Sequence, residues 1–319
     1  MAECSEFELI ARYLTGLGAA RADVELGVGD DAAIVRGDHG RCVFALDTLI
    51  EGVHFPADLP AAAVGYRALA VNLSDMAAMG ASPLWALMGL TLPWVDEDWV
   101  AAFAKGIDGI ARAHGVAIIG GDVTRGPLGV SLQITGSVDS PLRRDGAQAG
   151  DQLWVSGRPG EAAAGLALWQ ANQRHQPASQ GLVQAFCYPR PKIALGQSLA
   201  GIATAAIDVS DGLAADAGHI AEQSHLAVVF ERAACRASAR LIAQVGLNQA
   251  QAYWLGGGDD YELCFSASAA ARPAVEAAAR QARTAVRPIG WLREGQGVWL
   301  DDQRLAPGQQ AGYQHFGQA

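Results

Sequence analysis

The chain has 319 residues, half of them hydrophobic, and a formal net charge of -10. This length and apolar content allow two domains, each with its own core. The acidic balance argues against sequence-independent nucleic-acid binding, which requires a basic surface. We expect a soluble, cytoplasmic protein without membrane contact, because no apolar run is long enough to span a bilayer and the N-terminal segment lacks a secretory-signal profile.

The first half of the chain predicts a sheet with helices between its strands. A short strand is expected at the end of GVGDDAAIV (27–35), and longer ones in CVFALDT, PLWALMGLTLP, GVAIIGGDV and GVSLQITGSV, which begin at residues 42, 83, 115 and 129. The stretches 60–80 and 96–114 are rich in alanine and repeat apolar residues at helical spacing, which predicts helices.

The segment SPLRRDGAQAGD, residues 140–151, concentrates proline, glycine and charge, so we place the domain boundary there, with domains 1–145 and 146–319. Further strands are then predicted in 151–157, 205–212, 226–231, 261–267 and 286–292, and helices in 158–172, 190–203, 213–224 and 271–283. The sequence therefore predicts a mixed α/β protein of two domains.

Aspartates recur beside glycine or a small residue where these predicted strands end. They are Asp47, Asp122, Asp208, Asp211, Asp259 and Asp260. Asp75 differs, because it falls in a predicted helix that ends near Gly80. Aspartate also favours turns and helix caps for local reasons, and that explanation is adequate for Asp96, Asp98 and Asp139. For the whole set, loops at strand ends are the usual place for sites in α/β proteins, so we expect a shared carboxylate site.

Converging carboxylates repel one another unless protons or cations are bound. Oxygen-only ligands without histidine or cysteine spacing suit Mg²⁺ or Mn²⁺, and Mg²⁺ is usually completed by phosphates and water. The five cysteines are scattered and indicate neither a disulfide framework nor a zinc site. No GxxxxGK[ST], GxGxxG after a strand, GxSxG or HExxH motif occurs. A phosphate enzyme with this sequence would work through metal ions and a few arginines.

Eight motifs along nearly the whole chain resemble those of the thiamine-monophosphate kinase family. In order, they are GVGDDAAIV, ALDTLIEGVHF, AVNLSDMAAMGASP, IIGGDVTRG, RRDGAQAGD, AIDVSDGLAAD, GGGDDYELCF and GYQHF. The resemblance implies the two-domain α/β fold of the aminoimidazole ribonucleotide synthetase superfamily, with an N-terminal sheet that forms a barrel across a homodimer. It also implies transfer of the γ-phosphate of ATP to thiamine monophosphate, which gives thiamine diphosphate.

The resemblance assigns metal and nucleotide roles to individual residues. Several Mg²⁺ ions would be held by Asp30, Asp47, Asp75, Asp122 and Asp208, and a further ion by Asp211. Asp30, Asp75 and Asp122 would act catalytically through these ions, with no general base. Gly121, Asp122, Arg144 and Ser210 would contact ATP. Arg143 is an equally plausible replacement for Arg144, and Ser210 could instead cap the following helix.

On the substrate side, the resemblance implies contacts from His54, Asp259 and Phe316. His54 could simply be a hydrogen-bonded histidine at a strand end. Relatives commonly have glutamate at position 259, so Glu262 remains an alternative to Asp259, as does Tyr313 to Phe316.

Other departures from the family pattern are Ala45 and Leu46, where relatives often carry hydroxyl residues, and His114, where tyrosine is frequent. Neighbours in an extended segment point to opposite faces, so we expect Asp30 to bind metal and Asp31 to support the site or cap the backbone.

Two further interpretations of the sequence compete with the kinase. Within the superfamily, selenophosphate synthetase requires a reactive cysteine near an early lysine, and Cys4 has no lysine near it. Outside enzymes, the chain could be a non-catalytic relative that binds Mg²⁺ and nucleotide. The complete aspartate set together with His54 favours the kinase.

Overall fold

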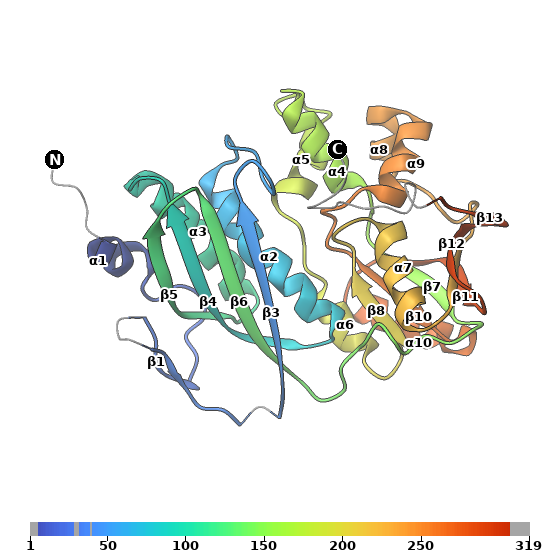
Figure 1. Ribbon diagram of the computed structural model, residues 1–319, viewed down its shortest axis with the longest axis horizontal. Helices are drawn as coiled ribbons and strands as arrows, with labels where there is room; N and C mark the ends of the chain where they lie inside the picture. Colours follow the sequence, from blue (N-terminus) through green and yellow to red (C-terminus); the bar gives the residue numbers. More distant parts are fainter. Residues whose placement is uncertain (1–5, 29–31, 39, 307–319) are drawn as a thin grey trace. The chain divides into compact units, whose positions relative to one another are not determined.

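The structure, a computed structural model, describes residues 6–28, 32–38 and 40–306 (Figure 1). Asp30, Asp31, Tyr313 and Phe316 therefore lie outside the described residues. The chain divides into two compact units. Unit 1 comprises Met1–Met76 and Ser82–Asp139, and unit 2 comprises Ala77–Ala81 and Ser140–Ala319.

Unit 1 is built on a four-stranded sheet with the order β3-β6-β4-β5. Its strands are β3 (Arg41–Ile50), β4 (Ser82–Leu92), β5 (Ala117–Arg125) and β6 (Gly129–Val138), and a separate pair is formed by β1 (Val24–Leu26) and β2 (Ile34–Val35). β6 pairs antiparallel with both β3 and β4, whereas β4 and β5 are parallel. Among the described residues this sheet does not close on itself; β3 and β5 are its two edges, and Gly18 forms a single bridge to Ala117 at the start of β5.

The helices of unit 1 are α1 (Glu6–Leu9), which runs into a π-helical turn η1 (Ile10–Leu14), α2 (Ala61–Ala78) and α3 (Glu97–Ala113). α2 and α3 cover one face of the sheet (Figure 1). α3 buries a stripe that includes Val100, Phe103 and Ile107, as its helical spacing predicts. Asp96 caps this helix by accepting a hydrogen bond from the Trp99 N–H at 3.0 Å, which confirms the capping role expected for it.

Unit 2 contains a seven-stranded sheet with the order β13-β12-β9-β11-β7-β10-β8. Its strands are β7 (Gln152–Ser156), β8 (Ala205–Asp208), β9 (Ala227–Phe230), β10 (Leu263–Ala267), β11 (Val286–Arg293), β12 (Gly297–Leu300) and β13 (Gln303–Arg304). Its helices are α4 (Glu161–Gln170), α5 (Gln180–Cys187), α6 (Ile193–Leu199), α7 (Leu213–Gln223), α8 (Ala239–Val245), α9 (Leu247–Gly256), the 3₁₀ turn η2 (Ala269–Ala271) and α10 (Arg272–Gln281).

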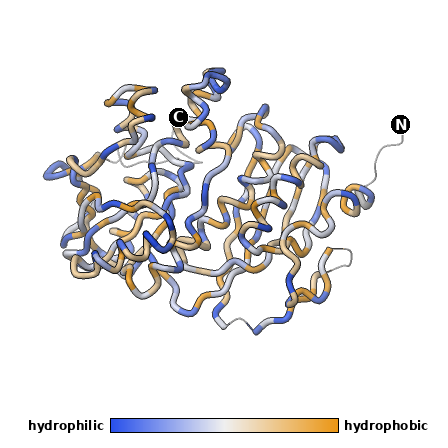
Figure 2. Tube along the Cα trace, turned by 180° about the vertical axis from the view of Figure 1, so that it is seen from behind, coloured by the Kyte–Doolittle hydropathy of each residue, from blue (hydrophilic) through white to orange (hydrophobic). Residues whose placement is uncertain are grey.

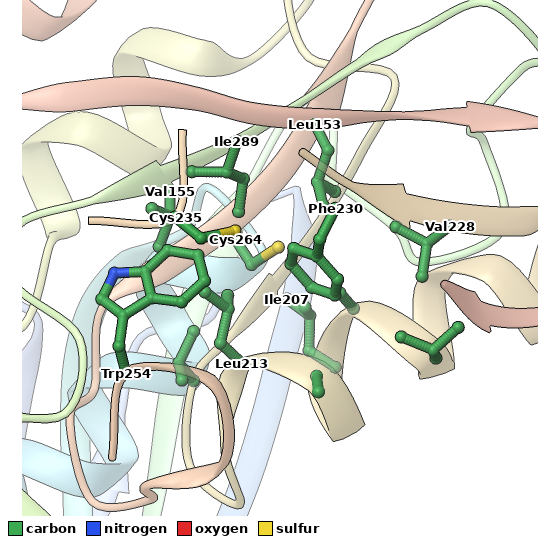
Figure 3. Packing of buried hydrophobic residues seen from close by; sticks show 14 of the residues in the cluster. Leu153, Val155, Ile207, Leu213, Val228, Phe230, Cys235, Trp254, Cys264 and Ile289 are labelled. Carbon is green, nitrogen blue, oxygen red and sulfur yellow. The ribbon is translucent and has the colours of Figure 1, made fainter. Parts of the chain in front are cut away.

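The core of unit 2 forms where side chains of this sheet meet α7 and α9. Phe230 and Trp254 pack edge to face at its centre, with ring centroids 6.2 Å apart. Figure 3 shows Ile207, Leu213 and Cys264 around them. Close packing of this kind fixes the ends of β8 and β10, and with them the loops that follow or precede these strands.

The mixed α/β fold predicted from the sequence is confirmed, and every predicted strand and helix is present, but two details were wrong. Asp47 and Asp122 were expected at strand ends, yet both lie inside strands, because β3 and β5 continue to Ile50 and Arg125. The prediction also lacked several short elements, which are α1, η1, β1, α5, α8, α9, β12 and β13.

None of the described helices is both long and apolar enough to cross a membrane. Apolar and polar residues instead alternate along the trace in both units (Figure 2).

Candidate functional site

In unit 1, two of the predicted site residues come together. Asp47 on β3 and Asp75 on α2 share a hydrogen bond between their carboxyl groups. Burial raises the pKa of the Asp47 carboxyl, and the hydrogen bond with Asp75 opposes that rise. Two carboxyls at hydrogen-bond distance cannot both be ionised cheaply, so the pair must hold either a proton or a cation.

This pair suits a hard divalent cation, because it offers only oxygen ligands. Among the described residues, no group of three or more histidine, cysteine, aspartate or glutamate side chains is arranged to hold a metal ion. Mg²⁺ is typically bound by one or two protein carboxylates, with phosphates and water completing its coordination. Asp47 and Asp75 fit that pattern, in which substrate phosphates supply the remaining ligands.

Asp122 is placed differently from Asp47. It is exposed on β5, at the opposite edge of the sheet from β3. The order β3-β6-β4-β5 puts three inter-strand steps between these edges, which is about 14 Å. A single chain therefore does not bring Asp122 to the ion that Asp47 and Asp75 could hold.

Gly121, the residue before Asp122, has a backbone reason to be glycine. Its φ is 148°, and a Cβ there would lie 1.9 Å from the carbonyl oxygen of Met88 on β4. Any larger residue would push β5 away from β4. The glycine thus fixes the position of Asp122, whether or not nucleotide also approaches it.

His54 follows β3 and is oriented by the end of that strand. The Ile50 N–H donates to its Nδ1 at 2.9 Å, and the His54 N–H donates back to the Ile50 carbonyl, also at 2.9 Å. Because Nδ1 is the acceptor, the neutral ring carries its proton on Nε2. His54 is therefore a satisfied histidine at a strand end, as one interpretation proposed, and its ring is also held in one tautomer.

Unit 2 gathers a second set of carboxyls around the N-terminus of α7. Asp208 ends β8 and is buried, and Asp211 follows in the loop. Oδ2 of the buried Asp216 accepts the N–H groups of Asp211 and Gly212 at 3.2 and 3.0 Å. The pKa of Asp216 is raised to about 8, chiefly by burial and also by the charges of Asp208 and Asp211, while the two backbone hydrogen bonds oppose the rise.

Asp216 received no role from the sequence, although it lies within the motif AIDVSDGLAAD. Its role could have been predicted from its position one helical turn after Gly212, because a carboxyl there lies beneath the N–H groups of the loop and can accept their hydrogen bonds. Ser210 does not cap α7, since the residue before that helix is Gly212.

The loop after β8 is hydrogen-bonded to the segment before β10. The N–H groups of Asp259 and Tyr261 donate to the carbonyls of Ser210 and Val209, both at 2.8 Å. A Cβ on Gly258 would lie 2.4 Å from the Ser210 carbonyl oxygen, so only glycine permits this approach. The structure thus brings together Ser210, expected at ATP, and Asp259, expected at the substrate.

The acids around Asp259 point to different partners. Asp260 is buried, and its carboxylate accepts the N–H groups of Gly160 and Ala162 at 2.6 and 3.2 Å, at the start of α4. Burial raises its pKa, and these two hydrogen bonds oppose the rise.

The Glu262 carboxylate accepts a hydrogen bond from the Ser156 hydroxyl and lies 3.2 Å from Nζ of Lys192. Glu262 is therefore occupied inside unit 2, whereas Asp259 is more exposed.

The two neighbouring arginines, Arg143 and Arg144, have different partners. Arg143 forms an ion pair with Asp145, whose carboxylate accepts its Nε–H at 2.8 Å. The Arg144 carbonyl accepts the Ser224 hydroxyl at 2.9 Å, which fixes the backbone there. Within the part of the chain that the structure describes, the Arg144 guanidinium has no hydrogen-bond or ion-pair partner. Arg144 is thus the better placed of the two to contact a phosphate.

Comparison with known proteins identifies the class to which this chain belongs. Residues 29–138 match the family model of the AIR synthase related protein, N-terminal domain. Over 98% of its length the chain is 40% identical to the thiamine-monophosphate kinase of Salmonella typhimurium, of which 98% is covered. The chain belongs to the thiamine-monophosphate kinase family.

Solved structures agree with this assignment. The crystal structure of thiamine-monophosphate kinase from Stenotrophomonas maltophilia K279a is 42% identical, with a TM-score of 0.86 over 94% of this chain and 96% of that one. AaThiL complexed with AMPPCP and TMP is 31% identical, with a TM-score of 0.79 over 91% of this chain and 92% of that one.

Proposed function

We propose that this protein transfers the γ-phosphate of ATP to thiamine monophosphate, giving thiamine diphosphate and ADP, the last step in making that cofactor. The observation that carries the proposal is the near full-length similarity to a structure holding both AMPPCP and TMP. The carboxyl pair Asp47–Asp75 adds a place for a cation beside the phosphates. We place the protein in the cytoplasm, where ATP is the common phosphate donor.

In unit 1, Asp30, Asp47, Asp75 and Asp122 are the proposed ligands of Mg²⁺, which when bound would neutralise the phosphates and hold them in line. Gly121 keeps Asp122 at its edge of the sheet, next to the proposed ATP site. His54 would present its Nε2–H to thiamine monophosphate, because its Nδ1 already accepts a backbone hydrogen bond.

In unit 2, Asp208 and Asp211 are the proposed ligands of further Mg²⁺, and Ser210 and Arg144 the contacts to ATP. The guanidinium of Arg144 has no partner among the residues that the structure describes, which supports its choice over Arg143. For the substrate we propose Asp259, because Glu262 is already occupied by Ser156 and Lys192. Phe316 stays a proposal from the family pattern.

The chemistry requires no general base from the protein. A phosphate monoester has a second pKa near ~6, so the attacking oxygen of thiamine monophosphate is largely ionised at neutral pH. The remaining barrier is to bring two anionic phosphates together in the right geometry. Only two lysines occur in the chain, so protein cations contribute little to this task beyond the arginines.

We also propose that the chain forms a homodimer through the sheet of unit 1. The face of this sheet away from α2 and α3 exposes Phe44, Leu46 and Leu87, at 69%, 65% and 41%. Exposed apolar side chains on an open sheet with two edges favour closure against a second copy. Two such sheets would complete the barrel expected from the family.

The two edges restrict how this barrel can close. If Asp47 and Asp122 are ligands of one ion, β3 of one subunit must lie beside β5 of the other, so that each ion receives Asp122 from the partner subunit. A two-fold axis then gives two identical sites. Each site would be incomplete in the monomer.

Mixed subunits test this arrangement. Asp47→Asn and Asp122→Asn homodimers should both be inactive, whereas a mixture unfolded and refolded together should recover about a quarter of wild-type turnover, because half of the dimers carry one intact site. A mixture of Asp47→Asn and Asp75→Asn, whose carboxyls meet within one chain, is the matched control and should recover nothing. Equal recovery in both mixtures would refute the shared site.

The proposed activity is tested by incubating purified protein with Mg-ATP and either thiamine or thiamine monophosphate, followed by separation of the products. Thiamine diphosphate formed from the monophosphate is the expected result. Product formed only from free thiamine would contradict the assignment. Nucleotide binding without any product would instead indicate a non-catalytic relative.

A further inference from the structure

We propose that Tyr261 is a positioning residue, whose hydroxyl holds the carboxylate of Asp259 in the orientation that binds thiamine monophosphate. This inference rests on the proposed function and on the place of Asp259 in it. Thiamine carries a permanent positive charge on its thiazolium ring, so a fixed carboxylate is a suitable partner.

The direct observation is a hydrogen bond between the two side chains. The Tyr261 hydroxyl donates to Oδ1 of Asp259 at 3.0 Å. Tyr261 is only 9% exposed, so its ring is held by the surrounding packing. A hydroxyl on a fixed ring removes rotational freedom from the carboxylate that accepts its proton, which reduces the entropy lost when a ligand binds.

The backbone of this segment is costly to form. Asp259 and Tyr261 have φ values of 66° and 50°, in the left-handed region. Aspartate tolerates this region moderately well, but a bulky residue such as tyrosine rarely adopts it. Strained backbone of this kind persists where the surroundings enforce it, and it is concentrated at functional sites.

The surroundings do enforce it here. The N–H groups of both residues donate to the loop after β8, to the carbonyls of Ser210 and Val209. Between them, Asp260 turns inward and caps the start of α4. These bonds place residues 259 and 261 so that their side chains meet.

A purely structural role predicts a different result from a positioning role. If Tyr261 only fills space, the ring matters and the hydroxyl does not. Tyr261→Phe keeps the ring and removes the hydroxyl, so it separates the two interpretations. Tyr13→Phe is a matched control, because Tyr13 donates a similar hydrogen bond to Glu97 at 2.8 Å in unit 1.

The test is a double-mutant cycle in steady-state kinetics with Tyr261→Phe, Asp259→Ala and the double variant. Tyr261→Phe should raise the KM for thiamine monophosphate about 3- to 10-fold, with kcat, the KM for ATP and the melting temperature nearly unchanged. In the Asp259→Ala background, Tyr261→Phe should have no further effect. Tyr13→Phe should leave all kinetic constants unchanged.

Wild-type kinetics in Tyr261→Phe would overturn the proposal. An equal loss with and without the Asp259 carboxylate would also overturn it, because Tyr261 would then act independently of Asp259. Failure of the proposed function is distinguishable, since wild-type protein itself would then form no thiamine diphosphate.

Discussion

Two regions of the molecule, the Asp47–Asp75 pair of unit 1 and the segment 260–262 of unit 2, satisfy their acids in different ways. In unit 1, the carboxyl of Asp47 meets the carboxyl of Asp75. In unit 2, Asp260 meets backbone N–H groups, and Glu262 meets a hydroxyl and an ammonium group. An acid whose partners are donors is satisfied by the protein, whereas two acids facing each other require something from outside. The comparison teaches that the partner of a carboxylate, more than its sequence motif, separates a binding role from a structural one.

The largest effect is expected from the unit 1 pair. Asp75→Asn should lower turnover by at least about 100-fold, because a proposed ligand of the ion that would neutralise the phosphates is lost. The free energy of unfolding should stay the same or rise, since one of two repelling acids is removed. Steady-state turnover at saturating Mg²⁺ and urea unfolding measure the two quantities.

Asp96→Asn is the control for this change, because Asp96 has only a capping role and asparagine caps equally well. Near-normal turnover in Asp75→Asn would show that the Asp47–Asp75 pair has no binding role that distinguishes it from Asp260 and Glu262.

In unit 2, we expect the substitution of an acid to lower stability. Glu262→Gln leaves the largely buried Lys192, whose side chain is 13% exposed, without its carboxylate and should lower the free energy of unfolding by about 3 kcal/mol. Glu276→Gln breaks the exposed ion pair with Arg272 and should cost less than about 0.5 kcal/mol. Urea unfolding followed by circular dichroism compares them. Equal stability of both variants would show that Glu262 is not a structural acid.

A smaller effect tests the exposed sheet of unit 1. Phe44→Glu should weaken self-association by about 2 kcal/mol or more, because a charge would enter an apolar interface. Trp94→Glu is the control, since Trp94 is 71% exposed in the loop after β4. Analytical ultracentrifugation across a concentration series measures both. Dissociation by Trp94→Glu but not by Phe44→Glu would place the interface elsewhere.

The smallest effect concerns His114, which ends α3. Burial lowers the pKa of this imidazole, so the folded state resists a proton that the unfolded chain accepts near pH ~6.5. Stability should therefore fall as the pH decreases through that value, until His114 is protonated in the folded state as well.

His114→Gln should lose this component, which we expect to be below about 1 kcal/mol. Unfolding free energies between pH 7 and pH 5 measure it, and identical curves for the two proteins would contradict the assignment.

The sequence predicted the fold well because its strands are apolar runs and its longer helices repeat apolar residues at helical spacing. It missed α5, α8 and α9, which have only 8, 7 and 10 residues. It ended β3 too early, because the predicted strand CVFALDT placed Asp47 at the strand end, whereas β3 continues to Ile50. In the structure, β3 pairs with β6 through all ten of its residues.

The candidate site was harder to predict from the sequence than the fold. The motif GGGDDYELCF offers three acids, and nothing local says which of them face inward. The partners that decide this, Ser156 and Lys192 for Glu262, lie far away in the chain. The contact between Asp47 and Asp75 likewise depends on how a strand meets a helix.

The central claim is that the unit 1 carboxyls hold the cation through which phosphate is transferred to thiamine monophosphate. Transfer of label from γ-phosphate-labelled ATP to thiamine monophosphate, followed across a Mg²⁺ titration in wild type and Asp47→Asn, tests it most directly. We expect wild-type transfer to require Mg²⁺, and Asp47→Asn to need far higher concentrations or to stay inactive. Transfer that persists after chelation of all divalent cations, or that has the same Mg²⁺ dependence in both proteins, would contradict the account.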